Sequence, residues 1–191
     1  MRIVAGKHRG RNLATPHGRD TRPTSDRVRE AIYNVLSHGY DLDFEDLVVL
    51  DVYAGSGALA LEALSRGAAR AIFLDTAQAA LDCVAANVDT LKENAHSTIL
   101  RREVRRLGAL PAGAEPAGLA FFDPPYRENM IAPALAAAGE GGWLADGAVV
   151  VVETADDEEI EIPSGFNALD ERRYGKTLVR FLKYDPSAAT E

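Results

Sequence analysis

The stretch that decides the fold is residues 47–68, which read LVVLDVYAGSGALALEALSRGA. A run of aliphatic and β-branched residues leads into a glycine-containing turn. An Ala- and Leu-rich segment follows the turn and ends at Gly67. The run predicts a buried strand, the glycines predict a tight loop, and the last segment predicts a helix. Together they predict a strand–loop–helix unit.

The same alternation continues along the chain and predicts an α/β fold. The sheet is expected to be mostly parallel, with helices on both faces and an antiparallel closing strand from a hairpin around Gly175. Beyond residues 47–68, strands are expected at 69–75, 97–104, 117–123, 147–153 and in the tail at 166–184, and helices at 77–95 and 130–138.

Two elements are expected before residue 47. Short apolar pieces alternate with basic residues and glycines in residues 1–16, which predicts a basic β-hairpin extension. A helix is expected to begin near Thr24, Ser25 or Asp26, since each is a plausible N-cap. Its apolar stripe leaves Arg27 and Arg29 outside, and consists of Val28, Ile32, Val35 and Leu36.

Length and composition limit the class of protein. The 191 residues suit one domain, and a hydrophobic fraction of 47% supplies a core. No apolar run is long enough to span a membrane, and the N-terminus lacks a signal-peptide pattern. Cys83, the single cysteine, is expected to be a small buried hydrophobe. These features favour a cytoplasmic protein without a metal cluster.

The net charge of −8 is unevenly distributed. Residues 1–40 contain 8 Lys and Arg against 3 Asp and Glu, whereas the remainder contains 13 against 26. A basic leading segment on an acidic protein is typical of a polyanion-binding face, although a basic solvated surface gives the same pattern.

The glycine turn predicts a ligand site. Gly55 and Gly57 allow a ligand to approach the backbone, and the first N–H groups of the following helix would face it. Asp75 ends the next strand, where an acid can accept the hydroxyls of a ribose. The pattern also fits a dinucleotide fingerprint. Asp51 disfavours a pyrophosphate there and suits a cationic group, such as the sulfonium or ammonium of S-adenosylmethionine.

The strand at 117–123 ends in Asp123-Pro124-Pro125-Tyr126. The prolines stop the strand and fix the direction of the Pro124 carbonyl, beside the Asp123 carboxylate. Two acceptors and an aromatic ring suit an exocyclic amino group on a nucleobase. A strand-ending turn without a catalytic role is the alternative.

These residues resemble the class I S-adenosylmethionine-dependent methyltransferases. More closely, they resemble the RsmD family of bacterial 16S ribosomal RNA guanine-N2 methyltransferases. The resemblance rests on the segments RIVAGKHRGRNLATP, TRPTSDRVREAIYNVL, DVYAGSGALALEALSRGA, FFDPPY and GWLADGAVVVVE. The resemblance implies a Rossmann-like domain at 21–185 with a seven-stranded sheet, an N-terminal extension at 1–20 and a frayed tail at 186–191. It implies a metal-independent enzyme, expected to be a monomer, that acts on 16S rRNA or the small ribosomal subunit.

The resemblance also assigns residues. The cofactor, S-adenosylmethionine, would be bound by Asp51, Tyr53, Gly55, Ser56, Gly57, Asp75, Thr76, Arg22 and Thr24. The guanine amino group would be held by Asp123, Pro124, Pro125 and Tyr126. Phosphates would be contacted by Arg2, Lys7, Arg9, Arg11, Arg22 and Arg27. The segment ILRREVRRLG departs from the family near the adenine, where Arg102 or Glu103 stands in place of a small polar or acidic residue. Glu103 is taken as the contact, and backbone N–H groups that hold the adenine are the alternative.

Alternatives remain open. An adenine-N6 methyltransferase acting on DNA or RNA would use the same Asp-Pro-Pro-Tyr chemistry. An NAD(P)-dependent oxidoreductase would explain the glycine turn but not Asp123-Tyr126. A non-catalytic RNA-binding module would need neither the glycine turn nor the Asp123–Tyr126 segment for catalysis. The histidines are expected to be surface or phosphate contacts and not metal ligands; they are His8, His17, His38 and His96.

Overall fold

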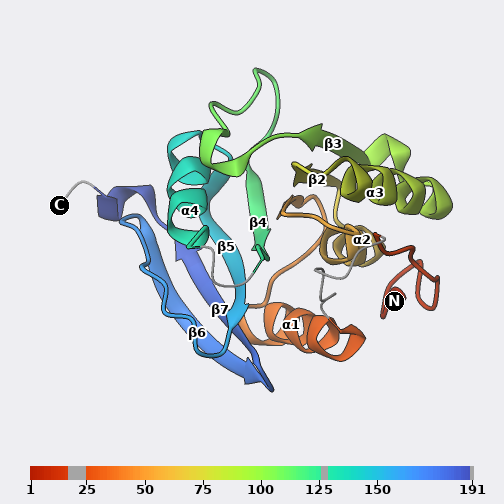
Figure 1. Cartoon of the computed structure of the whole chain (residues 1–191), viewed down its shortest axis with the longest axis horizontal. Helices are drawn as coiled ribbons and strands as arrows, with labels where there is room; N and C mark the ends of the chain where they lie inside the picture. The colour runs from red at the N-terminus through yellow and green to blue at the C-terminus, as the bar shows by residue number, and fades with distance from the viewer. Residues whose placement is uncertain (17–24, 126–128, 190–191) are drawn as a thin grey trace. The chain divides into compact units, whose positions relative to one another are not determined.

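The computed structural model describes residues 1–16, 25–125 and 129–189 (Figure 1). The chain forms two compact units, Met1–Arg101 and Arg102–Glu191. The division falls within the domain predicted at 21–185, whose limits stay a prediction. No helix in the described ranges has the length and apolar character needed to cross a membrane.

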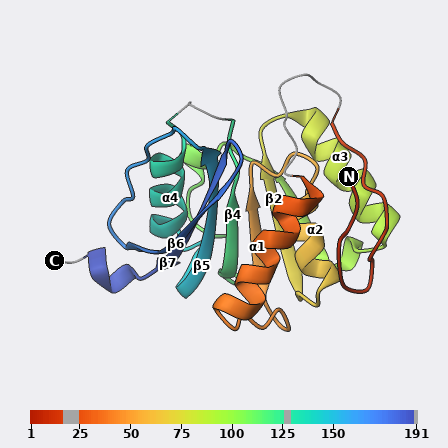
Figure 2. The ribbon, with the colours of Figure 1, turned by 90° about the horizontal axis from the view of Figure 1, so that it is seen from below.

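The first unit contains a parallel sheet in the order β3-β2-β1. Each of the first two strands is followed by a helix of Ala- and Leu-rich sequence (Figure 2). Every residue of β1 is buried, as expected of a parallel strand covered on both faces. The strands are β1 (Val48–Val52), β2 (Arg70–Asp75) and β3 (Ser97–Arg101), and the helices are α2 (Ala58–Ser65), α3 (Gln78–Leu91) and the short η1 (Asn94–His96).

Helix α1 (Asp26–Gly39) precedes this sheet in the chain. Ser25 is its N-cap, since the Ser25 side chain accepts the Val28 N–H at 3.2 Å. Ile32, Tyr33 and Leu36 are buried, but so is Arg29, whose side chain is 0% exposed. The prediction that Arg29 lies off the buried stripe is therefore wrong. A charged side chain on this face is stabilised by ion pairs with Asp26 and Glu62.

The second unit contains the other strands, in the order β4-β5-β7-β6. β4 and β5 are parallel, whereas β7 is antiparallel to both β5 and β6. The described residues form seven strands, of which the pairs β1–β2, β2–β3 and β4–β5 are parallel and the last strand, β7, is antiparallel to its neighbours. This arrangement confirms the predicted fold class. The elements are η2 (Val104–Arg106), β4 (Ala117–Phe122), α4 (Ile131–Glu140), β5 (Leu144–Ala155), β6 (Phe166–Tyr174) and β7 (Thr177–Tyr184).

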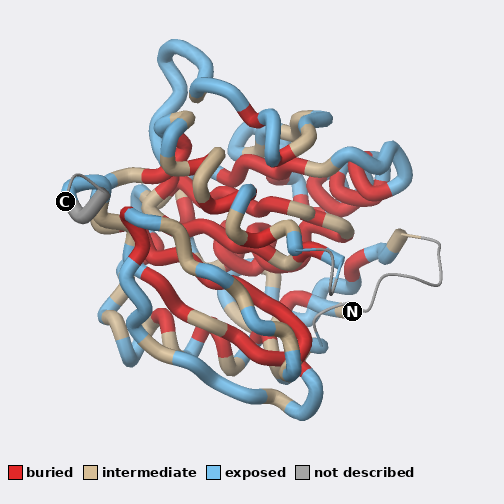
Figure 3. The backbone as a smooth tube through the Cα atoms, turned by 60° about the vertical axis from the view of Figure 1, so that its left-hand side comes forward, coloured by how far each residue is buried: buried red, intermediate tan, exposed pale blue. Residues whose placement is uncertain are grey.

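The closing hairpin turns at Gly175, as predicted, with a φ of 65° that favours glycine. β6 is mostly exposed, whereas five of the eight residues of β7 are buried. Figure 3 colours the backbone by burial. Residues 186–191, expected to be a frayed tail, begin with the short helix η3 (Pro186–Ala189). Residues 190 and 191 lie outside the described part.

Residues 1–16 form a segment that we call the N-terminal arm. Its two halves are joined by one antiparallel bridge, Arg2 to Asn12, and by backbone hydrogen bonds that include Ile3 N–H to Arg11 O at 2.9 Å. No β-strand longer than this bridge is formed by the described residues of the arm, so the predicted β-hairpin is not confirmed.

Candidate functional site

The loop after β1 is shaped by left-handed backbone conformations. Tyr53, Gly55 and Gly57 have φ values of 65°, 56° and 75°. Such a value is rare for a bulky residue like Tyr53. A Cβ at Gly57 would lie 3.0 Å from Phe73 Cε1 and 3.3 Å from Val84 Cγ2. Glycine is therefore required at position 57 both by the backbone and by the close approach of β2 and α3.

Asp51 lies near the carboxyl end of β1 and is only 2% exposed. Burial raises the pKa of its carboxyl to about 8; the Ala60 N–H, 3.2 Å from Oδ2, opposes this rise, and the negative charge of Asp75 adds to it. A cationic ligand beside Asp51 would favour the carboxylate and lower this pKa. The pairing of Asp51 with a positively charged group stays a prediction.

Asp75 ends β2, and its carboxylate organises the loop. Oδ2 accepts the Gly55 N–H at 3.0 Å, and Oδ1 accepts the Ala77 N–H at 2.9 Å. Because each carboxylate oxygen can accept more than one hydrogen bond, Asp75 keeps capacity for ligand hydroxyls. Asp75 therefore joins the glycine loop to the start of α3 at the strand edge where a ribose was expected.

Ser56 is enclosed by two contacts from other parts of the first unit. Its hydroxyl lies 3.5 Å from the sulfur of Met1, and its carbonyl accepts the Asn87 side-chain N–H at 2.9 Å. The Gly57 N–H donates to Ala54 O at 2.6 Å. The peptide unit between Ser56 and Gly57 is thus held on both sides.

Other predicted cofactor residues are less informative. Thr76 is exposed, and its carbonyl accepts the Arg101 Nε–H at 3.1 Å. The Glu103 carboxylate pairs with Arg105 at 2.8 Å and Arg106 at 3.8 Å. Its assignment to the adenine stays a prediction. Arg22 and Thr24, together with the intervening Pro23, lie outside the described residues.

The segment Asp123-Pro124-Pro125 directly follows β4, which ends at Phe122 as expected. Asp123 is half-buried, Pro124 is buried and Pro125 is exposed. Tyr126 lies outside the described residues. The expected strand end is confirmed, and the substrate role of these residues stays a prediction.

The N-terminal arm is docked on the helices of the first unit. The buried Glu62 carboxylate on α2 accepts the Val4 N–H at 2.7 Å and the Ala5 N–H at 2.9 Å. Ser65 accepts the His8 N–H at 3.0 Å through its hydroxyl. A Cβ at Gly6 would lie 1.8 Å from Ser65 O, so only glycine allows this approach. The arm is therefore a packed part of the unit.

Some arm cations have acidic partners. Lys7 Nζ lies 2.7 Å from the Glu93 carboxylate, which His8 and His96 also contact at 2.5 and 2.8 Å. Arg2 pairs with Asp26 at 3.4 Å, although its side chain is 67% exposed. The arginines of the arm, Arg2, Arg9 and Arg11, are exposed. Their contact with phosphates stays a prediction.

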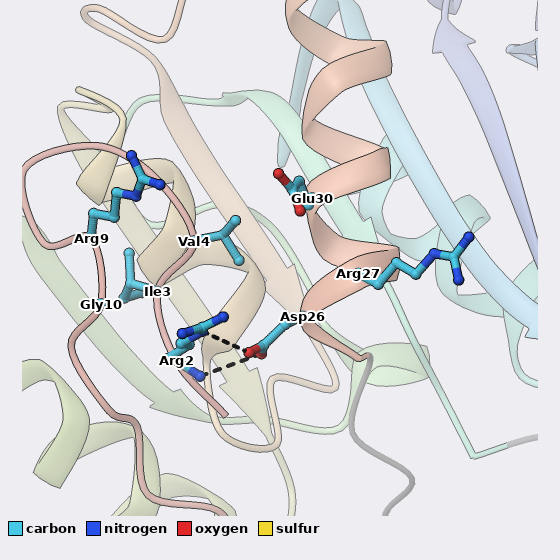
Figure 4. A pocket seen from close by; sticks show the side chains of 8 residues that line it. All are labelled: Arg2, Ile3, Val4, Arg9, Gly10, Asp26, Arg27 and Glu30. Atoms are coloured by element: carbon cyan, nitrogen blue, oxygen red, sulfur yellow. Dashed lines mark hydrogen bonds and ion pairs between the residues drawn. The ribbon is translucent and has the colours of Figure 1, made fainter.

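A groove of about 370 Å³ lies between the arm and α1. In Figure 4, Arg2 points toward Asp26, whereas the Arg9 and Arg27 side chains point away from each other. Acidic and basic groups share the groove, so it offers no uniform phosphate cradle. Its lining consists of Arg2, Ile3, Val4, Arg9, Gly10, Asp26, Arg27 and Glu30.

Sequence reasoning missed the residues that dock the arm. Asn87 lies on the apolar stripe of its helix, and Glu62 lies within an Ala- and Leu-rich helix. A polar residue on such a face signals a specific buried partner. That signal identifies the residue but not the partner. Within the described ranges, no group of His, Cys, Asp and Glu side chains is arranged to hold a metal ion.

The fold matches that of solved methyltransferase structures. The family described as Conserved hypothetical protein 95 matches residues 1–183. Ribosomal RNA small subunit methyltransferase D of Escherichia coli (strain K12) is 31% identical over 192 residues, covering 100% of this chain and 93% of that protein. The chain therefore belongs to the Conserved hypothetical protein 95 family, which includes this relative.

Two further relatives cover the chain nearly completely. YlbH of Bacillus subtilis (strain 168) is 36% identical over 190 residues, covering 96% of this chain and 98% of that protein. The solved structure of yhhF from Escherichia coli has a TM-score of 0.80 and 32% identity, covering 97% of this chain and 98% of that one. The protein is thus an enzyme of the methyltransferase class, and the oxidoreductase alternative has no support.

Proposed function

We propose that this protein transfers a methyl group from S-adenosylmethionine to the N2 amino group of a guanine in 16S rRNA of the small ribosomal subunit. The observation that carries the proposal is the buried Asp51 carboxyl beside a glycine loop that Asp75 fixes. Relatives named ribosomal RNA small subunit methyltransferase D support the substrate class. We further propose that the enzyme acts in the cytoplasm as a monomer.

The residues present fit this cofactor. Asp51 has a raised pKa that a cation would relieve, and the Asp75 carboxylate retains acceptor capacity for ribose hydroxyls. The backbone of the glycine loop, with Ser56 between two glycines, would border the methionine part. When bound, S-adenosylmethionine supplies an electrophilic methyl group on a sulfonium. The protein contributes charge placement and alignment.

On the substrate side, we assign Asp123 and the Pro124 carbonyl to the guanine amino group. The lone pair of this nitrogen is delocalised into the ring, which makes it a poor nucleophile. Two fixed acceptors would hold both N–H groups and favour a pyramidal nitrogen with its lone pair free to attack. Pro125 would stiffen the backbone, and Tyr126 would stack on the base, a role that rests on sequence alone.

For RNA binding, we assign the exposed basic residues of the arm and α1, which are Arg2, Lys7, Arg9, Arg11 and Arg27. Phosphate contacts of this kind position a nucleic acid without reading its sequence. The arm would therefore contribute affinity, and the base would be selected elsewhere.

The experiment that tests the proposal is methyl transfer from labelled S-adenosylmethionine to small ribosomal subunits, free 16S rRNA and duplex DNA. We expect labelled N2-methylguanine in ribosomal RNA, and none in DNA. Label in N6-methyladenine would support the adenine alternative and overturn the guanine assignment. Asp123→Ala should abolish transfer while RNA binding survives. Persistence of transfer in this variant would contradict the role of Asp123.

A further inference from the structure

A buried side chain, Asn87 on α3, bridges the N-terminal arm and the glycine loop. Asn87 Oδ1 accepts the Ala14 N–H at 2.7 Å, and Asn87 Nδ2 donates to Ala14 O at 3.0 Å. The same Nδ2 donates to Ser56 O at 2.9 Å. Asn87 is 1% exposed and its bond to Ser56 O is buried, whereas its two bonds to Ala14 are partly buried. The Asn87 amide therefore contacts both the arm and the loop.

The chemistry of an amide is required at this position. Asn87 Oδ1 accepts one hydrogen bond, and Nδ2 donates to the Ala14 and Ser56 carbonyls and also lies 3.7 Å from Cys83 Sγ. A carboxylate could accept but could not donate, and an aliphatic side chain could do neither. The three bonds therefore specify asparagine more closely than packing alone would.

The arm reaches Ser56 from its other end as well. The Met1 sulfur lies 3.5 Å from Ser56 Oγ, and the Met1 carbonyl accepts the Leu13 N–H at 3.0 Å. Met1 thus contacts Ser56 directly, whereas Ala14 is linked to Ser56 through Asn87. Because the Ser56–Gly57 peptide is planar and held on both sides, the position of the arm fixes the orientation of that loop peptide.

We propose that Asn87 is a positioning residue that couples RNA binding on the arm to cofactor binding on the glycine loop. RNA that holds the arm in its docked position also holds Ala14, Asn87 and the Ser56 carbonyl in the arrangement that the cofactor needs. By linkage, the cofactor favours the docked arm to the same degree. This inference rests on the proposed function, because it takes the arm as an RNA-binding element.

The first test measures the affinity for radiolabelled S-adenosylhomocysteine by equilibrium dialysis, with and without saturating small ribosomal subunits. In the unmodified enzyme we expect the subunits to raise the affinity about tenfold, a typical coupling between two sites. In Asn87→Leu the ratio should fall close to 1. A role in folding alone would lower both affinities and leave their ratio unchanged, which would overturn the proposal.

Ser65→Ala is the matched control. Ser65 also holds the arm, through His8 N–H at 3.0 Å and Ala5 O at 2.5 Å, but it does not contact Ser56. We expect weaker binding to the subunits in this variant, with the coupling ratio retained. Loss of the ratio in Ser65→Ala as well would contradict a specific role for Asn87.

A second measurement needs no variant. Hydrogen exchange of the Ala14 amide in the unmodified enzyme should slow when S-adenosylhomocysteine binds in the absence of RNA. Unchanged exchange would overturn the coupling. The outcomes also separate the two proposals: an enzyme that binds no ribosomal RNA would sink both, whereas RNA binding without coupling would sink only this inference.

Discussion

At the scale of single residues, we expect Asp51 to be the group on which cofactor binding depends most. Asp51→Asn keeps the shape and removes the negative charge that a cationic ligand would need. We expect a loss of S-adenosylhomocysteine affinity of about a hundredfold, measured by calorimetry, as removal of a buried ion-pairing partner costs about 3 kcal/mol. An unchanged affinity would exclude the ligand ammonium as the partner of Asp51.

The same variant should be more stable than the unmodified protein at pH 7. The folded-state pKa of Asp51 is raised to about 8 from an ordinary value of 3.8. Between these values the folded state holds a proton that the unfolded state releases, so stability falls as the pH rises. Unfolding by urea at pH 7 should therefore show Asp51→Asn to be about 1–3 kcal/mol more stable than the unmodified protein. A loss of stability would contradict this environment.

Cofactor affinity should depend on pH through the same carboxyl. Below its pKa of about 8, Asp51 must lose its proton before it can pair with a cation. In the unmodified enzyme, the affinity for S-adenosylhomocysteine should increase about tenfold between pH 6 and pH 7. Asp51→Asn should show no such rise, since it has no proton to release there. Parallel profiles would assign the dependence to another group.

At the scale of elements, docking of the arm on α2 depends on Gly6. A Cβ at Gly6 would meet the Ser65 backbone, whereas Gly10, with a similar positive φ of 82°, has open space around its Cβ position. Both Gly→Ala variants bear the same backbone strain, about 1 kcal/mol. Only Gly6→Ala should also displace the arm and weaken binding to small ribosomal subunits. Equal effects on that binding would argue against docking by close approach.

The contact between the arm and the C-terminal end of α3 should be sensitive to acid. Burial raises the pKa of the Glu93 carboxyl, but hydrogen bonds from His8, Lys7 and His96 outweigh it and hold the pKa below its ordinary value. A lowered pKa gives stability above the unfolded value of 4.5, which is lost as the pH falls through the folded value. In urea titrations, Glu93→Gln should lose stability at pH 7 and little at pH 3. Equal losses at both pH values would contradict this.

At the scale of the whole molecule, local patterns predicted most of the fold. The apolar run of β1, the glycine turn and the Ala-rich helix after it are short-range features, and they appear where the sequence placed them. The strand-end acids could be predicted because parallel strands bring their carboxyl ends to one edge.

The arm could not be predicted in the same way. Its docking uses backbone N–H groups of Val4 and Ala5 on the carboxylate of Glu62, more than fifty residues away in the chain. Backbone groups are the same at every position and leave no pattern in the sequence. Arg29 was predicted wrongly for a related reason, since its burial depends on partners in α2 that periodicity does not record.

The central claim, methylation of a guanine in 16S rRNA, is tested most directly by mapping modified nucleotides. Mass spectrometry of 16S rRNA from cells that lack this protein should show one N2-methylguanine lost relative to the parent cells. Restoring the unmodified gene should return the modification, whereas a gene encoding Asp123→Ala should not. An unchanged set of methylated guanines in the cells that lack the protein would contradict the account.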